Sequence, residues 1–321
     1  MTWSLLPTFR DENSAEGDTG GCTDLVILNQ WYPISAIDEL QIGIAYQSVL
    51  LEVKIGFGVD RDGTLKVWLQ AMHFVEPGQQ IPALANGLLP TQSSFGYLWT
   101  TLGASPVPLF EIPEFDEPDR RNLNAASFGV ATSAPRAVEN FLDMGHFPFV
   151  HTGVLGAEPF TEVVDYDVEI RNGEIFATGC KFAQPQAAPG SVEPIVTDYI
   201  YRIPHPYCVL LYKTGAFDTQ RLDVIGLFIQ PLGQEEIRAH TLLSVLDDVT
   251  SRTGLRRFQL GIFSQDKPIL ENQVPKRLPL SPSSETPIRA DKSSIAYRRW
   301  LQLMGVTYGV ISPHDSHMGE Y

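Results

Sequence analysis

The sequence predicts an α+β fold, in which a small all-β unit precedes an antiparallel sheet with a long C-terminal helix packed across it. Three observations support this prediction. The chain contains 26 glycines and 24 prolines, a content that favours many turns and therefore much sheet. Residues 161–182 form two strand-like segments around an Asn-Gly pair, which is a β-hairpin signal. Residues 251–274 carry apolar side chains at helical spacing, which predicts one long amphipathic helix.

Length and composition limit the classes of protein to which the chain can belong. Its 321 residues allow about two domains or one large one, and a hydrophobic content of 43% suffices for a buried core. The net charge of −15 disfavours a nucleic-acid groove or an anionic membrane surface as partner, because both need a basic face. No apolar run approaches the roughly 18 residues of a membrane span, and the N-terminus lacks a secretory signal.

Cysteine usage gives a further limit. Cys22, Cys180 and Cys208 are too few and too scattered for a disulfide framework or a Cys₄ metal site. They fit a reducing compartment, so we expect a cytoplasmic protein. Cys180 and Cys208 lie on or beside predicted strands, where we expect small buried hydrophobic side chains.

The N-terminal third is expected to be a tail followed by strands. Residues 1–23 are predicted to be a disordered tail, since residues 10–23 are polar, glycine-rich and without periodicity. Ordered structure should begin near Leu25, within a β domain over residues 24–125. The expected elements of this domain are strands within residues 46–70 around a turn at 60–63, a loop at 74–94, a strand at 95–102 and an extended connector at 107–121.

Residues 126–309 are expected to form a second domain, followed by a tail over residues 310–321. The domain opens with a strand and then a helix over residues 135–145, because Pro135 suits the first helical position and Ser133 can cap it. A meander of strands leads to the long helix and to a final helix. The predicted elements are strands at 127–133, 161–170, 175–182, 197–203, 207–214, 223–230 and 238–246, and helices at 251–274 and 293–305.

The segment from Asn140 to His151 carries the most informative residues. Asp143 and His146 lie three residues apart and therefore on one face of a helix. Pro148 interrupts the helix before His151, so that the second imidazole can turn back toward the first. Two neutral imidazoles suit a divalent metal, and Asp143 is placed to accept the second N–H of a ligating histidine. The spacing alone leaves open the alternative of two packed, hydrogen-bonded core histidines.

The long helix carries one carboxylate in an apolar stripe. Leu255, Phe258, Ile262, Asp266 and Ile269 follow one another at steps of three or four residues. A carboxylate in such a stripe is costly unless it is paired, hydrogen-bonded or bound to a metal. A stripe that faces solvent at Asp266, or a neighbouring arginine, would be the alternative explanation. With two histidines, this carboxylate would complete the 2-His-1-carboxylate triad that binds Fe(II) and leaves positions open for O₂.

These motifs resemble the catalytic domain of Rieske non-haem iron oxygenase α-subunits, in which Asp-x-x-His-x₄-His is followed far downstream by an Asp. The resemblance runs from about residue 24 to residue 309 and implies a helix-grip catalytic domain after a Rieske-like β domain. The segments that carry it, besides the motif, are residues 29–40, 95–103, 263–275 and 288–301.

The resemblance also implies roles for individual residues. His146, His151 and Asp266 would be the iron ligands. Asp143 would be the carboxylate that links the iron site to a cluster, and Asn140 matches the Asn often found just before it.

One feature of that family is missing from the sequence. A Rieske [2Fe–2S] centre needs Cys and His in C-x-H and C-x-x-H pairs, and the sequence contains neither. Residues 71–94, where the family places its cluster loops, contain His73 and no cysteine, and we interpret His73 as an ordinary loop histidine. The sequence therefore predicts a Rieske-like domain without a [2Fe–2S] cluster of its own.

Across residues 139–159 and 262–280, the sequence is similar to a branch of the family that lacks its own cluster, the catalytic subunits of bacterial purine N-demethylases acting on 7-methylxanthine. The resemblance implies a mononuclear Fe(II) enzyme that removes an N-methyl group with O₂ and releases formaldehyde. It implies electrons that come ultimately from NADH through a Rieske-domain reductase. It also implies a glutathione-transferase-like structural partner and an oligomer, either a trimer or a mixed assembly.

The substrate is expected to be a small molecule in an apolar pocket between the sheet and the long helix, with Phe149, Phe263 and Leu270 in its wall. Three alternatives remain open. An enzyme of the same class could act on an O-methyl group or a ring C–H bond. The chain could instead be a non-catalytic scaffold subunit of an oxygenase complex, or a helix-grip binding module without metal.

Overall fold

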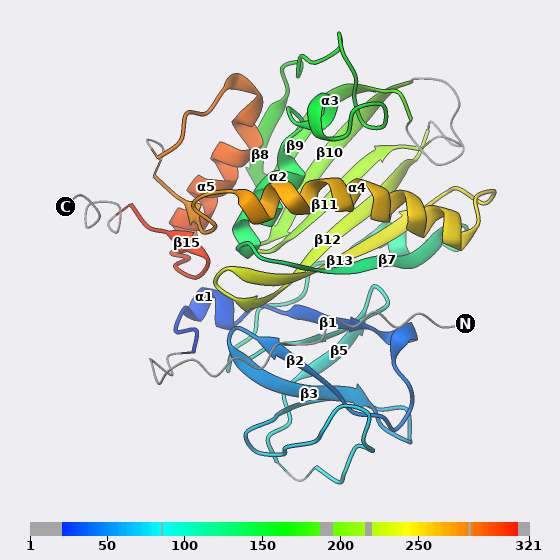
Figure 1. The fold of residues 1–321 in the computed structure, drawn as a ribbon, viewed down its shortest axis with the longest axis vertical. Coiled ribbons are helices and arrows are strands. Elements are labelled where there is room, and N and C mark those ends of the chain that lie inside the picture. The colour runs from blue at the N-terminus through cyan, green and yellow to red at the C-terminus, as the bar shows by residue number, and fades with distance from the viewer. Residues whose placement is uncertain (1–20, 85, 187–194, 216–219, 282–283, 314–321) are drawn as a thin grey trace.

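A seven-stranded antiparallel sheet forms the centre of the structure, a computed structural model that describes residues 21–84, 86–186, 195–215, 220–281 and 284–313. Helix α4 runs across one face of this sheet, and the N-terminal strands pack below it (Figure 1). The predicted α+β fold with a helix-grip arrangement is confirmed. In spatial order the strands are β7 (Arg121–Val130), β13 (Glu236–Val245), β12 (Leu222–Gly233), β11 (Cys208–Thr214), β10 (Ile195–His205), β9 (Glu174–Gln184) and β8 (Asp167–Arg171).

Two local features of the large sheet follow from the sequence. Asn172 and Gly173 join β8 to β9 with φ angles of 53° and 84°, which is the backbone that a tight hairpin requires and which Asn and Gly tolerate best. β7 begins at Arg121, earlier than the predicted strand, because its pairing with β13 continues to Val245. The domain boundary expected between residues 125 and 126 therefore falls inside a strand of the large sheet.

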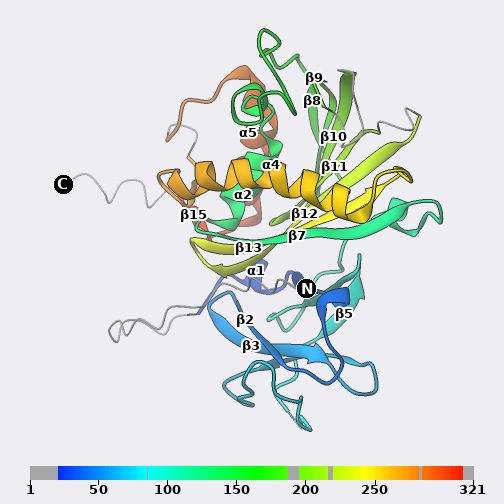
Figure 2. The same ribbon diagram turned by 45° about the vertical axis from the view of Figure 1, so that its right-hand side comes forward.

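The N-terminal part contains two three-stranded antiparallel sheets, ordered β1-β6-β5 and β2-β3-β4. These strands lie below the large sheet in the view of Figure 2. The strands expected within residues 46–70 and 95–102 are present. β5 lies in the expected loop 74–94, because the polar segment Thr91–Ser94 is held by pairing with β6 and not by an apolar pattern of its own. The elements are α1 (Leu25–Leu28), β1 (Tyr32–Ala36), η1 (Ile37–Glu39), β2 (Tyr46–Leu50), β3 (Val53–Val59), β4 (Leu65–Leu69), β5 (Thr91–Ser94), β6 (Tyr97–Thr100) and η2 (Pro113–Asp116).

Helices and one small parallel pair complete the large unit. Val310 and Ile311, placed in the expected C-terminal tail, form a strand that pairs with Leu278 and Pro279. Most of the expected N-terminal tail, residues 1–20, and residues 314–321 lie outside the described residues. The elements are α2 (Ala134–Leu142), α3 (Phe147–Val150), α4 (Arg252–Asn272), β14 (Leu278–Pro279), η3 (Arg289–Asp291), α5 (Lys292–Met304) and β15 (Val310–Ile311).

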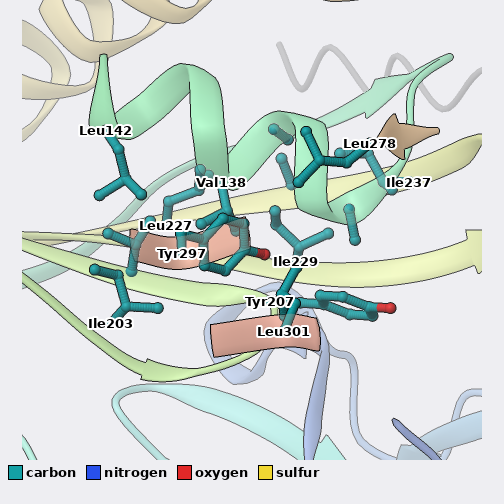
Figure 3. Packing of buried hydrophobic residues seen from close by; sticks show 14 of the residues in the cluster. Val138, Leu142, Ile203, Tyr207, Leu227, Ile229, Ile237, Leu278, Tyr297 and Leu301 are labelled. Carbon is teal, nitrogen blue, oxygen red and sulfur yellow. The ribbon is translucent and has the colours of Figure 1, made fainter. Parts of the chain in front are cut away.

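The hydrophobic core lies between α2, α5 and the large sheet and holds the C-terminal end of α2 in place (Figure 3). Val138 and Leu142 of α2 are fully buried against Leu227 and Ile229 of β12, and Leu301 of α5 lies in the same cluster. Fully burying a side chain of this kind stabilises the fold by roughly 1.5–3 kcal/mol. This packing anchors the segment that follows α2, which contains both motif histidines.

Candidate metal centre

Two local features after α2, a turn closed by the Asp143 side chain and the short helix α3, bring His146 and His151 together. Ser133 caps α2 by accepting a hydrogen bond from the Arg136 amide, as predicted. The helix ends at Leu142 and not near residue 145, because the Asp143 carboxylate accepts a hydrogen bond from the Gly145 amide at 2.7 Å and this turn competes with helix continuation. The single-turn helix α3 follows, with His146 and His151 at its two ends.

Helix α4 supplies the third group. Its buried side chains are Leu255, Gln259, Phe263, Asp266 and Leu270, so Asp266 faces the protein interior with only 8% of its surface exposed. The stripe expected from the sequence is wrong at its last position, since Ile269 is half exposed and Leu270 takes the buried place. The spacing of four residues between Asp266 and Leu270 keeps the buried face turned toward the sheet.

His146, His151 and Asp266 converge on one point. The two Nε2 atoms are 3.1 Å apart, and Asp266 Oδ1 lies 3.4 Å from His146 Nε2 and 3.0 Å from His151 Nε2. Three donor atoms at such separations can all bind a single ion at metal–ligand distances of about 2.1 Å. Among the described residues, this is the one group of three or more His, Cys, Asp or Glu side chains with metal-binding geometry.

The outer nitrogens of both imidazoles have acceptors. His146 Nδ1 faces Asp143 Oδ2 at 3.2 Å, and His151 Nδ1 faces Gln265 Oε1 at 2.9 Å. These acceptors favour a proton on each Nδ1, so both Nε2 atoms present lone pairs toward Asp266. Asp266 Oδ1 is buried and has no hydrogen-bond partner. Three lone pairs that meet without a proton repel one another, and a cation removes that repulsion. The residues therefore fit a bound metal ion.

The electrostatics of the centre favour positive charge. Burial disfavours a charged imidazole at His146, but the nearby carboxylates of Asp143 and Asp266 outweigh it and raise the pKa of His146 to about 9. Burial likewise opposes ionisation of Asp266, yet contacts with His146 and His151 lower its pKa. A proton or a metal ion can supply the positive charge that this arrangement stabilises.

Of the other residues that the sequence predicted for the site, two line a cavity at the metal centre and two do not. Asn140 on the last turn of α2 and Phe263 on α4 both line a cavity that reaches His146 and Asp266. Contrary to expectation, Phe149 and Leu270 do not line this cavity. Phe149 points outward from α3 and is 64% exposed, and Leu270 is buried in the hydrophobic core.

The opposite wall of the cavity is the large sheet, and sequence reasoning missed its polar members. Tyr199 and Tyr201 of β10, Lys213 of β11, and Asp223 of β12 line it together with Asp247, just beyond β13. The alternation of residues 197–203 could have placed both tyrosines on one face. The inward direction of Lys213 could not be read so easily, and its burial lowers its pKa to about 8.

A second, wider cleft of about 800 Å³ also reaches His146. Asp143, His146 and Asn140 form part of its wall, and much of the rest comes from the C-terminal end of α4, the first half of α5 and residues of the segment between these helices. Asp143 is about one-third exposed, so one end of the Asp143–His146 contact is accessible from outside while the ligand atoms lie inside.

Comparisons with known proteins identify relatives of this chain. A family model for the C-terminal domain of vanillate O-demethylase oxygenases matches residues 130–306. A probable methylxanthine N7-demethylase, NdmC, from Pseudomonas sp. (strain TJI-51) is 47% identical over 285 residues, which cover 88% of this chain and 96% of that protein. The methylxanthine N1-demethylase NdmA of Pseudomonas putida is 23% identical, over 94% of this chain and 87% of its own length.

Solved structures share the fold. NdmA of Pseudomonas putida CBB5 with caffeine matches with a TM-score of 0.70 and 18% identity, covering 86% of this chain and 90% of that one. Dicamba monooxygenase bound to 3,6-dichlorosalicylic acid matches with a TM-score of 0.69 and 14% identity, covering 87% and 97%.

The chain belongs to the Rieske non-haem iron oxygenase family, and it is an oxygenase. The expected family resemblance is confirmed, and the family implies a non-haem iron. Within the described residues, no helix is both long and apolar enough to span a membrane.

Proposed function

We propose that the chain is the catalytic subunit of a multicomponent oxygenase that removes an N-methyl group from a methylxanthine-like substrate and releases formaldehyde. The observation that carries this proposal is the convergence of His146, His151 and Asp266 within hydrogen-bonding distance of one another. The proposed occupant is mononuclear Fe(II). The relative that is 47% identical and named as a probable methylxanthine N7-demethylase supports the substrate class.

The protein would contribute ligands, orientation and exclusion of water. When bound, the iron supplies the activation of O₂ for attack on a C–H bond. Asp143 and Gln265 hold the protons on the outer nitrogens and so keep both imidazoles aimed at one point. Apolar side chains such as Phe263, Ile225 and Leu243 line the cavity and keep bulk water from the reacting methyl group.

The overall reaction balances with an external reductant. One O₂, two electrons and two protons convert the N–CH₃ group into N–CH₂OH and water. The hydroxymethyl product then loses formaldehyde as its C–N bond breaks, and a proton goes to the ring nitrogen.

The electrons would arrive from a partner. The chain contains no C-x-H or C-x-x-H pair for a Rieske cluster, so a reductase with a Rieske domain, itself reduced by NADH, is the proposed donor. The accessible side of Asp143 in the wide cleft supports entry there, through the carboxylate to His146. A glutathione-transferase-like subunit, and a trimer or mixed oligomer, complete the proposed assembly.

Metal analysis and a product assay test the proposal together. We expect about one iron per chain and no acid-labile sulfide, and loss of that iron in the double variant His146→Ala/His151→Ala. We expect formaldehyde from methylxanthines only when a Rieske-bearing reductase and NADH are both present. Turnover by the isolated chain with NADH alone would contradict the external electron source. An iron-free protein that still binds methylxanthine would favour a scaffold subunit or binding module.

One observation favours a second candidate activity. The matching family model is named for vanillate O-demethylase oxygenases, so O-demethylation of a methoxy-aromatic substrate is the alternative. Parallel assays with a methoxybenzoate and a methylxanthine distinguish the two, since both release formaldehyde but from different substrates.

A further inference from the structure

Apart from Asp266 Oδ1 at the candidate metal centre, three buried polar atoms in the cavity wall have no hydrogen-bond partner in the part of the chain that the structure describes. They are the hydroxyls of Tyr199 and Tyr201 and the Oδ2 atom of Asp247. The three residues are 2%, 0% and 4% exposed, so bulk water does not satisfy them. Buried polar groups in folded proteins are almost always hydrogen-bonded, so these three atoms call for a partner from outside the chain, either a water molecule or a ligand.

Other buried tyrosines of this chain show the usual pattern. The Tyr207 hydroxyl donates to the Tyr308 carbonyl at 2.6 Å, and the Tyr297 hydroxyl donates to the Pro206 carbonyl at 2.5 Å. The cavity tyrosines differ from them in lining an opening beside the metal centre. Their unpartnered state is therefore a property of the cavity and not of buried tyrosines in this fold.

Strand register places the two tyrosines in adjacent rows of the same sheet face. Tyr199 is paired with Lys213, which is paired with Asp223, across β10, β11 and β12. Tyr201 is paired with Leu211, and that row continues through Ile225 to Leu243, all of which line the cavity. Directly paired residues project from the same face of a sheet. The two phenol rings stack with centroids 6.2 Å apart, so both present hydroxyls to one region.

Asp247 supplies an acceptor of fixed orientation. Its Oδ1 atom accepts hydrogen bonds from the amides of Val249 and Thr250 at 3.0 and 2.7 Å, so the carboxylate cannot rotate freely. Oδ2 is the oxygen left over. The cavity thus offers two hydroxyl donors and one carboxylate acceptor, within a volume of about 110 Å³.

We propose that Tyr199, Tyr201 and Asp247 form a polar recognition subsite for the ring edge of the substrate, in which the hydroxyls donate to ring carbonyls and Asp247 accepts a ring N–H. The substrate class is a planar heterocycle with two carbonyls and at least one unsubstituted ring N–H, as in a pyrimidinedione ring. This inference rests on the proposed N-demethylation and narrows its substrate. A fully N-methylated ring lacks the donor for Asp247, and an anionic ring is repelled by it.

The tyrosine variants provide the first experiment. Tyr199→Phe and Tyr201→Phe remove only a hydroxyl, so each should weaken equilibrium binding of 7-methylxanthine by about three- to tenfold, as expected for one hydrogen bond, without lowering the melting temperature. Tyr207→Phe is the matched control, because its hydroxyl is already bonded away from the cavity. It should lower the melting temperature and leave binding within twofold. Unchanged binding in both cavity variants would overturn the subsite.

Asp247→Asn provides the second experiment. The amides of Val249 and Thr250 hold the side-chain oxygen, so the new NH₂ group takes the place of Oδ2 and turns an acceptor into a donor. Binding of 7-methylxanthine, which has two ring N–H groups, should weaken at least about tenfold, whereas caffeine, which has none, should bind at least as well as before. The ratio of the two dissociation constants is the readout, measured by calorimetry.

The outcomes separate this inference from the proposed function. If wild-type protein neither binds nor demethylates any methylxanthine with its reductase, the proposed function fails. If it demethylates 7-methylxanthine but the Asp247→Asn variant keeps the wild-type preference between the two ligands, the subsite fails while the function stands. If Asp247→Asn does not fold, the two tyrosine variants decide the question by themselves.

Discussion

Two pairs of histidines that are buried or largely buried in this chain have opposite environments. His146 and His151 meet Asp266 in front of the large sheet, with Asp143 and Gln265 as acceptors for their outer nitrogens. His205 and His240 lie in β10 and β13, where they contact the N-terminal strands through ring edges, His205 with Tyr32 and His240 with Tyr97.

Burial alone does not decide the charge state of a histidine in this protein. Carboxylates raise the pKa of His146 to about 9 in spite of its burial. Burial among aromatic rings lowers the pKa of His205 and of His240 to about 3, so both stay neutral. The first pair is prepared to face a cation, and the second pair is prepared to remain an uncharged part of the core.

The largest expected effect on iron binding and activity comes from removing the carboxylate of Asp266, which faces His146 and His151 but has no counterpart beside His205 and His240 among the described contacts. Asp266→Ala should abolish iron retention and lower demethylation by about a thousandfold or more, because the two imidazoles lose the ligand that completes the triad. Iron per chain and formaldehyde release are the measurements. His240→Gln is the control and should retain its iron. A fully loaded and active Asp266→Ala protein would contradict the assignment of the ligands.

The next effect concerns the hydrogen-bond acceptors of the two proposed histidine ligands. In Asp143→Asn, the amide that replaces Oδ2 would face the Nδ1–H of His146, so turnover or iron affinity should fall about 10- to 100-fold. The control is Asp291→Asn, which changes another acid of the same wide cleft. Asp291 does not contact the imidazoles, so turnover and iron affinity of this variant should stay within about twofold of the wild type. Equal behaviour of the two variants would mean that Asp143 acts only through the charge of the cleft.

Because His205 and His240 are neutral in the folded protein, we expect the stability of the fold to fall in acid. Because the folded-state pKa values of His205 and His240 lie near 3 and the unfolded value is about 6.5, the unfolded chain binds these protons first as the pH falls. The stability that the neutral imidazoles contribute is therefore present above pH 6.5 and lost progressively toward pH 3. Between pH 7 and pH 5 the loss should be at most about 2 kcal/mol for each residue.

Denaturant titrations at the two pH values measure this loss, with the metal loaded equally in all samples. The His240→Gln variant should show a smaller drop between pH 7 and pH 5 than the wild type, whatever its stability at pH 7. An identical drop in both proteins would place the acid sensitivity elsewhere.

The smallest effect tests a residue that the sequence placed at the site and the structure does not. Phe149 lies between the two proposed histidine ligands in sequence but is 64% exposed, so Phe149→Ala should change methylxanthine affinity by less than about twofold and stability by no more than about 0.5 kcal/mol. Phe263→Ala, by contrast, removes a ring that stacks on Phe128 at 4.2 Å and lines the cavity. A larger loss of affinity for Phe149→Ala than for Phe263→Ala would reverse the corrected assignment.

Much of the architecture was predictable because it depends on local signals. The hairpin at Asn172-Gly173, the Ser133 cap and the amphipathic helix α4 each follow from residues close together in the sequence. The predicted boundaries and elements are wrong where an interaction with another segment or side chain overrides the local pattern. Helix α2 stops early because the Asp143 side chain turns back on the Gly145 amide, and β5 exists because β6 pairs with it.

The amino-acid sequence by itself determined which residues are candidates for binding a metal, because Asp-x-x-His-x₄-His and a carboxylate in an apolar helix stripe are patterns of side-chain chemistry and spacing. Only the tertiary structure decided that these groups meet at about 3 Å, since Asp266 is brought from a helix more than a hundred residues away by packing against the sheet. It also decided the polar wall of the cavity. Tyr201, Lys213 and Asp247 come from three different segments, and strand pairing is a long-range interaction that no local pattern encodes.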